Sequence, residues 1–233
     1  MIVGRGIKKP GMPEEALSLL VALKASKVNT SPSYYKVLGN AYAILGNDED
    51  AQIAYKELPE QESAMLLGSL HVRRGRYGEA IEQLSSLADI PDTEEGAKVR
   101  IWLARAYMMQ SEYDSAAKEC EKARSCGDTN ALASIQYIEG LIGFYQGNYD
   151  RALAGLAGAR TAWQQSNRLV EEADALNAVG LVHFRQGSLD EALECFEETL
   201  VLAEQSGDKE RTVLTLMNVA VIAQESGKYE DAE

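Results

Sequence analysis

Two histidines, His71 and His183, are the side chains with the widest chemical range in this sequence. An imidazole can act as a general base near neutral pH or bind a metal through a ring nitrogen. Either role needs further donors at a defined spacing, and the chain contains no G-x-x-x-x-G-K-[ST], G-x-S-x-G or H-E-x-x-H pattern. Both histidines lie in apolar stretches with helical period, so we expect packed core side chains. No catalytic residue, metal ligand or cofactor site is predicted, and an enzyme is the last of the alternatives.

The three cysteines, Cys120, Cys126 and Cys195, form no C-x-x-C pair and are odd in number. This usage is typical of a reducing compartment. We expect Cys120 and Cys195 to be small buried side chains and Cys126, near a loop, to be exposed. No stretch is apolar for the length of a membrane span, and the first residues are too interrupted by Gly and Pro for a signal peptide. A cytoplasmic protein with no membrane partner is therefore predicted.

The 233 residues carry a formal net charge of −13 and have a pI near 4.7. Residues 131–233 contain 7 basic and 17 acidic groups, a net of −10. Because nucleic-acid binding needs clustered Lys and Arg, no nucleic-acid partner is predicted. Acidic pairs such as Glu197 and Glu198 are interpreted as solvated helix faces, with a basic or polar partner as the alternative.

Small residues recur along the whole chain in pairs. Alanines stand at intervals of 29 to 40 residues, each five residues after a glycine or serine. Glycine tolerates a left-handed backbone at a helix end, and alanine allows two helices to cross closely. The pattern predicts repeated helix–turn–helix units. The pairs are Gly11 and Ala16, Gly46 and Ala51, Gly75 and Ala80, Ser111 and Ala116, Gly147 and Ala152, Gly187 and Ala192, and Gly227 and Ala232.

The first helix of each predicted unit carries a small residue of its own, and residues 174–196, DALNAVGLVHFRQGSLDEALECF, show the whole pattern. The spacing of Gly180, Gly187, Ala192 and Phe196 resembles the tetratricopeptide repeat, a helical hairpin that stacks into a solenoid. The family usually has Tyr where this unit has His183. The small residues of the first helices are Gly39, Gly68, Ala104, Gly140, Gly180 and Ala220.

The resemblance implies an all-α fold, a right-handed superhelical solenoid of antiparallel helix pairs. A single solenoid is expected over residues 12–233, and residues 1–11 are expected to be poorly structured or part of a first helix. The expected complete repeats are 32–60, 61–92, 97–130, 133–170 and 173–210, with partial repeats at 12–27 and 213–233.

Differences in spacing predict differences in helix length. The interval of 29 residues after Ala51 predicts a short second helix that stops before Pro59. The last intervals, of 40 residues, predict longer helices, a form that resembles signalling adaptors and regulatory sensor domains. Ser188 and Glu191 match a capping box. Gly155 and Gly158, inside one predicted helix, indicate close approach of a neighbouring helix.

In the family, the first helices line a concave groove that binds partners. The corresponding positions here are rich in Met and aromatic side chains and are flanked by arginines, which favours an apolar peptide or helix as partner. For Phe144 and Phe184, packing against neighbouring helices is an equal alternative. The expected groove residues are Arg105, Met108, Met109, Tyr137, Leu141, Phe144, Tyr145, Asn177, Phe184 and Arg185.

A second set matches part of the carboxylate clamp of cochaperone relatives. Lys36 and Asn40 correspond to its first positions and Lys98 to a later one. The match then fails, because Leu66 replaces an Asn and Trp102 replaces an Arg. A complete clamp is not expected.

Both ends of the chain divide a repeat, which indicates part of a longer protein. The helix expected at residues 213–225 would expose Leu214, Leu216, Val219 and Val221, so an end-to-end homodimer is a further expectation.

The leading functional prediction is a non-enzymatic scaffold for protein–protein interaction that binds a peptide or helix of a partner. The alternative is a regulatory sensor domain that binds a small ligand or signalling peptide and controls an attached effector.

Overall fold

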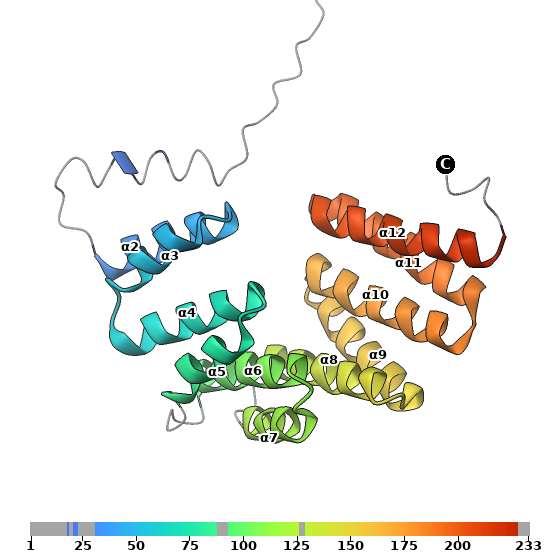
Figure 1. The fold of residues 1–233 in the computed structure, drawn as a ribbon, viewed down its shortest axis with the longest axis horizontal. Helices are drawn as coiled ribbons and strands as arrows, with labels where there is room; N and C mark the ends of the chain where they lie inside the picture. The colour runs from blue at the N-terminus through green and yellow to red at the C-terminus, as the bar shows by residue number, and fades with distance from the viewer. Residues whose placement is uncertain (1–17, 19–20, 23–30, 88–92, 126–128, 228–233) are drawn as a thin grey trace, which may run out of the picture. The chain divides into compact units, whose positions relative to one another are not determined.

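The computed structural model describes residues 18, 21–22, 31–87, 93–125 and 129–227. These residues form eleven named helices and no strand, which confirms the all-α fold (Figure 1). The chain divides into two compact units, Met1–Asp89 and Ile90–Glu233, each described by itself. The expected partial repeat at 12–27 and the segment 1–11 lie almost wholly outside the described residues, and a single solenoid over 12–233 stays a prediction.

The first unit contains two helical hairpins. Tyr55 at the end of the second helix and Leu58 in the connection after it lie in a core with Leu67 and Leu70 of the third helix, which joins the hairpins. The helices are α2 Pro32–Ile44 with α3 Asp48–Tyr55, and α4 Glu60–Arg73 with α5 Tyr77–Ser85.

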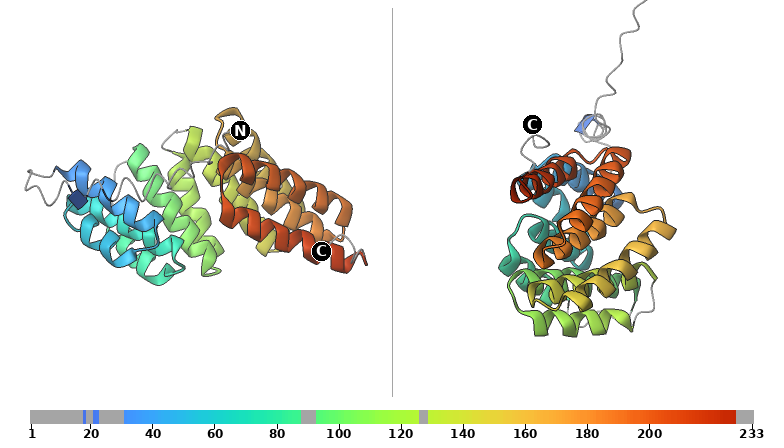
Figure 2. Two further views of the ribbon diagram at one scale, coloured as in Figure 1. Left: turned by 90° about the horizontal axis from the view of Figure 1, so that it is seen from above. Right: turned by 90° about the vertical axis from the view of Figure 1, so that its right-hand side faces the viewer.

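The second unit contains three hairpins and one further helix, and each hairpin packs against the next in chain order. Figure 2 shows α10, α11 and α12 as neighbouring helices from two directions. The helices are α6 Glu94–Met109 with α7 Tyr113–Arg124, α8 Thr129–Tyr145 with α9 Tyr149–Gln165, α10 Leu169–Gln186 with α11 Leu189–Ser206, and α12 Lys209–Glu225.

Left-handed residues end the first helices, as the small-residue pattern predicts. Gly147 has φ of +74° and Gly187 of +80°, and the serine that replaces glycine in the third complete unit, Ser111, also has a positive φ, of 64°. Most side chains are strained at such a position, and glycine avoids the cost.

The alanines of the pattern lie at the closest helix crossings. Ala51, Ala80, Ala116, Ala152 and Ala192 are all fully buried. Gly155 serves the same purpose within α9, because a methyl group there would lie 2.7 Å from the backbone oxygen of Gln136 on α8. The expected close helix approach at Gly155 is thus confirmed.

Helix length increases along the chain. The second helix of the first hairpin, α3, has 8 residues, and Pro59 is the N-cap of the next helix. By contrast α9 has 17 residues and α11 has 18. The short helix before Pro59 and the longer late helices are both confirmed.

The capping box expected at Ser188 is wrong. Ser188 is the N-cap of α11, but its side chain makes no capping hydrogen bond. Side-chain capping is present instead at Thr93, Asn148 and Asp208. Asn148 Oδ1 accepts from the Arg151 amide at 3.2 Å, and Asp208 Oδ1 accepts from the Arg211 amide at 2.9 Å.

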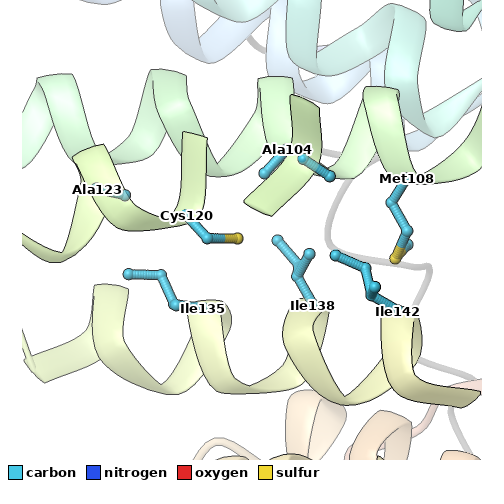
Figure 3. Close-up of a cluster of buried hydrophobic side chains, with 8 residues drawn as sticks. Ala104, Met108, Cys120, Ala123, Ile135, Ile138 and Ile142 are labelled. Atoms are coloured by element: carbon cyan, nitrogen blue, oxygen red, sulfur yellow. The ribbon is translucent and has the colours of Figure 1, made fainter. Parts of the chain in front are cut away.

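The largest core cluster of the second unit lies between α6, α7 and α8. Figure 3 shows Met108 pointing toward Ile142 and Cys120 beside Ile135, with Ile138 between them in the same cluster. Met108 is only 2 % exposed, so its expected place in a partner-binding groove is wrong. The flexible thioether fills the space between α6 and α8, because burying its apolar surface stabilises the fold more than exposing it.

Candidate functional site

A polar cluster lies on the first helices of the second unit, and we call it the Arg105 cluster. It combines two cations, a phenol, a carboxylate and two amides. Its members are Arg105 on α6, Tyr137 on α8, Asp174 and Asn177 on α10, and Arg211 and Asn218 on α12.

Tyr137 is held by aromatic contacts. Its ring centroid lies 5.4 Å from that of Trp163, which is buried in α9. The Cζ atom of Arg105 lies 5.9 Å from the centre of the Tyr137 ring and 5.9 Å from that of Trp102. The guanidinium is therefore within cation–π range of both rings.

The other side of the cluster is built by α12. The N-cap Asp208 holds the first turn of this helix, and the guanidinium of Arg211 then forms an ion pair with Asp174. Further along the same helix, Asn218 Nδ2 donates to Asn177 Oδ1 at 3.0 Å. Asn177 was an expected groove residue, whereas Arg211 and Asn218 were not predicted. Their one signal in the sequence is a spacing of seven residues, which puts both on one helix face.

Electrostatic coupling joins the two arginines through Tyr137. Burial raises the pKa of the Tyr137 hydroxyl, while the positive charges of Arg105 and Arg211 act to lower it. Burial also lowers the pKa of Arg211; the Tyr137 hydroxyl opposes that shift, and the charge of Arg105 adds to it. Two cations therefore share a partly desolvated site.

A second group lies at the start of α7 and near the ends of α8 and α10. We call it the aromatic cluster, and its members are Tyr113, Phe144, Tyr145 and Arg185. The rings of Tyr113 and Tyr145 are stacked at a centroid distance of 6.5 Å, and Phe144 lies 5.4 Å from Tyr145. The Cζ atom of Arg185 lies 5.9 Å from the Phe144 ring centre. Tyr145 is 50 % exposed, so this cluster offers an aromatic surface to solvent.

The other expected groove residues differ in exposure. Met109 is 42 % exposed, next to the buried Met108. Leu141 and Phe144 are partly buried against a core formed by α9 and α10, and Phe184 is partly buried against the core around Phe196. Packing within the chain therefore covers part of the Phe144 and Phe184 side chains, as in the alternative to partner binding that the sequence offered for both residues.

The clamp-like residues are engaged with side chains of this chain. Lys36 Nζ pairs with Glu62 Oε1 at 2.7 Å, and Asn40 Oδ1 accepts a hydrogen bond from the Tyr55 hydroxyl at 2.8 Å. Lys98, in the second unit, pairs with Glu94 one turn earlier at 2.5 Å. A carboxylate ligand would have to displace both acidic partners.

Three side chains that could be chemically reactive, His71, Cys120 and Cys195, are buried or partly buried. His71 is buried, with Nδ1 3.3 Å from Glu79 Oε2, and burial is the main reason that its pKa lies below the usual value. Cys120 is buried and Cys195 partly buried, and both thiols are free; the prediction for Cys126 lies outside the described residues. In the described part of the chain, no group of three or more His, Cys, Asp or Glu could hold a metal ion.

The last helix, α12, presents a row of apolar side chains to solvent. Met217 is 60 % exposed, and Val213, Leu214, Leu216 and Val221 are also exposed. Val219 is an exception to the expectation, because it packs against the core around Phe196 and Ile222. Within the described ranges, no helix has the length and apolar character needed to span a membrane.

Two family models, both described as tetratricopeptide repeat, match residues 65–131 and 171–233, together more than half of the chain. The chain belongs to the tetratricopeptide repeat family. Such repeats are generally non-catalytic scaffolds for protein–protein interaction, and that general class is supported here. A comparison with curated proteins finds no match.

Solved structures share the fold at low sequence identity. A signal transduction ATPase with a tetratricopeptide repeat sensor, from Pyrococcus horikoshii, has TM-score 0.70 and 19 % identity over 98 % of this chain and 39 % of its own. The Cut9–Hcn1 hetero-tetramer of the APC/C has TM-score 0.67 and 18 % identity over 89 % of this chain and 39 % of its own. A Rap protein complexed with competence and sporulation factor has TM-score 0.67 and 14 % identity, over 92 % and 76 %. The chain thus spans about two fifths of the first two structures' length.

Proposed function

We propose that this tetratricopeptide repeat chain binds a peptide or a helix of a partner protein along the first helices of its second unit. The observation that carries the proposal is the row of solvent-facing side chains at the ends of α6, α8 and α10. Met109 and Tyr145 are exposed apolar side chains, and Arg185 is an exposed cation beside them. Tyrosine and arginine are the residue types that most often carry binding energy at protein interfaces.

The support comes from how rigidly these side chains are held. Tyr145 is stacked on Tyr113 and packed on Phe144, and Phe144 also lies 6.5 Å from Tyr149. An aromatic side chain already fixed in the free protein loses little entropy on binding. The aromatic cluster is therefore suited to anchor an apolar side chain of the partner, with Arg185 free to orient a polar group.

The test is capture of a partner by the tagged chain from a lysate of the source organism, followed by calorimetry with the purified partner. A double variant, Tyr145→Ala with Arg185→Ala, should weaken binding at least about tenfold, as expected for the loss of an interface anchor. Val201→Ala, at an exposed apolar residue of α11, is the matched control. Equal affinity of the double variant and the control, with helical content unchanged, would remove this surface from the proposal.

The alternative function is a sensor domain for a small ligand or signalling peptide. Its support is the length of the late helices, 17 residues in α9 and 18 in α11, together with two solved structures that share this fold. One of them contains a tetratricopeptide repeat sensor, and the other is a Rap protein complexed with competence and sporulation factor. A ligand that binds only the folded chain raises its thermal midpoint, by an amount that grows with the logarithm of the ligand concentration relative to Kd. A thermal-shift screen of small molecules tests this function, because the proposed scaffold binds a peptide or a helix and would respond to no small molecule.

A further inference from the structure

Two shallow pockets lie at successive hairpin turns of the second unit and have equivalent linings. The first, of about 360 Å³, is lined by residues 111–115 and by Gln146. The second, of about 460 Å³, is lined by residues 146–150 and by Gln186. Each pocket combines a hairpin turn and the start of its second helix with a glutamine at the end of the next first helix. A difference in what the two pockets bind must therefore come from their side chains.

The first pocket has an aromatic edge. Tyr113 lines it, and the Tyr113 ring lies nearly parallel to the Tyr145 ring, at an interplanar angle of 14° and a centroid distance of 6.5 Å. The face of an aromatic ring attracts a cation that lies within about 6 Å of the ring centre. Because the two centroids are only 6.5 Å apart, one cation can lie within that range of both rings.

The same pocket contains two carboxylates. Glu112 and Asp114 flank Tyr113 along the chain, and both are exposed. The Ser115 hydroxyl donates to Glu112 Oε2 at 3.2 Å, and within the described ranges neither carboxylate has a cation within 4.0 Å. Their two negative charges exceed the partial positive charge at the start of α7, about half an elementary charge. The first pocket therefore favours a positively charged group.

The second pocket differs in charge. An amide, Asn148, stands where the first pocket has a carboxylate, and Arg185 stands where the first has Tyr145. The Cζ atom of Arg185 lies 5.9 Å from the centre of the Phe144 ring, and that ring lies 6.5 Å from the ring of Tyr149 in the pocket lining. At this turn a cation of the chain already faces the aromatic side chains, so a second cation would be repelled.

We propose that the first pocket binds an arginine side chain of the partner protein. Its guanidinium lies over the rings of Tyr113 and Tyr145 and donates to the carboxylates of Glu112 and Asp114. Arginine suits the pocket better than lysine, because a guanidinium is planar, stacks on aromatic faces and presents several N–H groups at once. This inference rests on the proposed function and adds a cation to the apolar side chain that the aromatic cluster anchors.

The experiment is an amide NMR titration of the full chain with a blocked dipeptide of leucine and arginine. One comparison dipeptide has citrulline in place of arginine, which keeps the shape and removes the charge. The other has lysine, which keeps the charge and removes the planar group. The amides of residues 111–115 and Gln146 report on the first pocket, and those of residues 148–150 and Gln186 report on the second.

The protein variants use the likeness of the two pockets. Asp114→Asn and Asp150→Asn are a matched pair, because both aspartates are exposed and each is the second residue of its helix, α7 or α9. Tyr145→Arg gives the first pocket the side chain that the second pocket has. Tyr145 is 50 % exposed, so this change should leave the fold intact, and unchanged amide signals elsewhere in the chain check that it does.

The expected results are specific to the first pocket. The arginine dipeptide shifts its amides saturably, and the citrulline dipeptide binds at least about tenfold more weakly. Tyr145→Arg weakens the arginine dipeptide at least about tenfold and Asp114→Asn severalfold, whereas Asp150→Asn changes it less than about twofold.

Several outcomes would overturn the inference. These are no saturable shift at the first pocket, equal shifts at the second pocket, equal binding of the citrulline or lysine dipeptide, or no effect of Tyr145→Arg. A partner captured from a lysate that depends on Tyr145 and Arg185 but not on Asp114 would overturn the arginine site and leave the proposed function intact.

Discussion

Gly155 of α9 lies directly against the backbone of Gln136 on α8, so that a methyl group at Gly155 would be 2.7 Å from the Gln136 carbonyl oxygen. The backbone cannot yield without moving both helices. We therefore expect Gly155→Ala to lower the free energy of unfolding by about 1–3 kcal/mol, despite the better helix propensity of alanine. Urea denaturation measures the change.

Gly158, one turn later, provides the control for this prediction. The three atoms nearest to a methyl group there belong to the side-chain amide of Gln136, the closest at 3.0 Å. Because that side chain can rotate away, Gly158→Ala should be neutral or stabilising. Equal losses for both variants would show that the contact with the Gln136 backbone does not determine the cost at Gly155.

Ser111 is a position where stability can be gained. Its φ of 64° is strained for a residue with a side chain. Ser111→Gly should raise the free energy of unfolding by about 1 kcal/mol. Asn167 has φ of 55°, but asparagine tolerates this region, so Asn167→Gly should gain less. Thermal unfolding of both variants decides the order, and a larger gain at Asn167 would contradict the explanation.

His71 should make the stability of the chain depend on pH. Burial lowers its pKa in the folded state, so the unfolded chain binds a proton first as the pH falls. The stabilisation contributed by neutral His71 is complete above the unfolded pKa of about 6.5 and is lost progressively below it. Relative to His71→Gln, wild type should lose stability between about pH 7.5 and pH 5. A relative gain would mean instead that Glu79 stabilises a protonated His71.

Cys120 should be nearly inert in the native protein. Burial raises the pKa of its thiol to about 12, and the thiolate is the reactive form. Iodoacetamide at about pH 8 should leave Cys120 unmodified in the folded chain and modify it in urea, as followed by peptide mass spectrometry. Cys195, whose pKa is raised but whose side chain is only partly buried, should react faster. Rapid native labelling of Cys120 would contradict its core position.

Self-association through α12 stays a prediction, now with defined residues. Met217 is 60 % exposed in an apolar row, so Met217→Glu should reduce any concentration-dependent rise in sedimentation coefficient. Val201→Glu, on an exposed apolar position of α11, is the charge-matched control. Identical sedimentation of wild type and Met217→Glu at high concentration would exclude this interface.

The repeat pattern predicted the fold well because it depends on local sterics. Glycine adopts the left-handed backbone of the turn at the lowest cost, and alanine allows the two helices to cross closely. Both requirements therefore appear in the sequence as small residues at a regular spacing. Ser111 shows how strong the constraint is, since the backbone keeps φ of 64° even without glycine. Helix lengths follow from the same spacing.

The site was predicted less completely, for two physical reasons. Met108 is at a position of the expected groove, but the rotation of α6 turns it into the core beside Ile138 and Ile142, which spacing does not reveal. Arg211 pairs with Asp174 across 37 residues, and such a contact depends on tertiary packing rather than on the repeat pattern. Exposure and long-range pairing are properties of the assembled helices.

The increase in second-helix length, from 8 residues in α3 to 18 in α11, has a consequence for how the chain folds. In repeat proteins each unit is stabilised by its own contacts and by those with its neighbours, so the unit with the longest helices is the natural nucleus. Folding should therefore start at the α10–α11 hairpin and its neighbours. The short hairpins of the first unit should open first under native conditions and show the fastest amide hydrogen exchange.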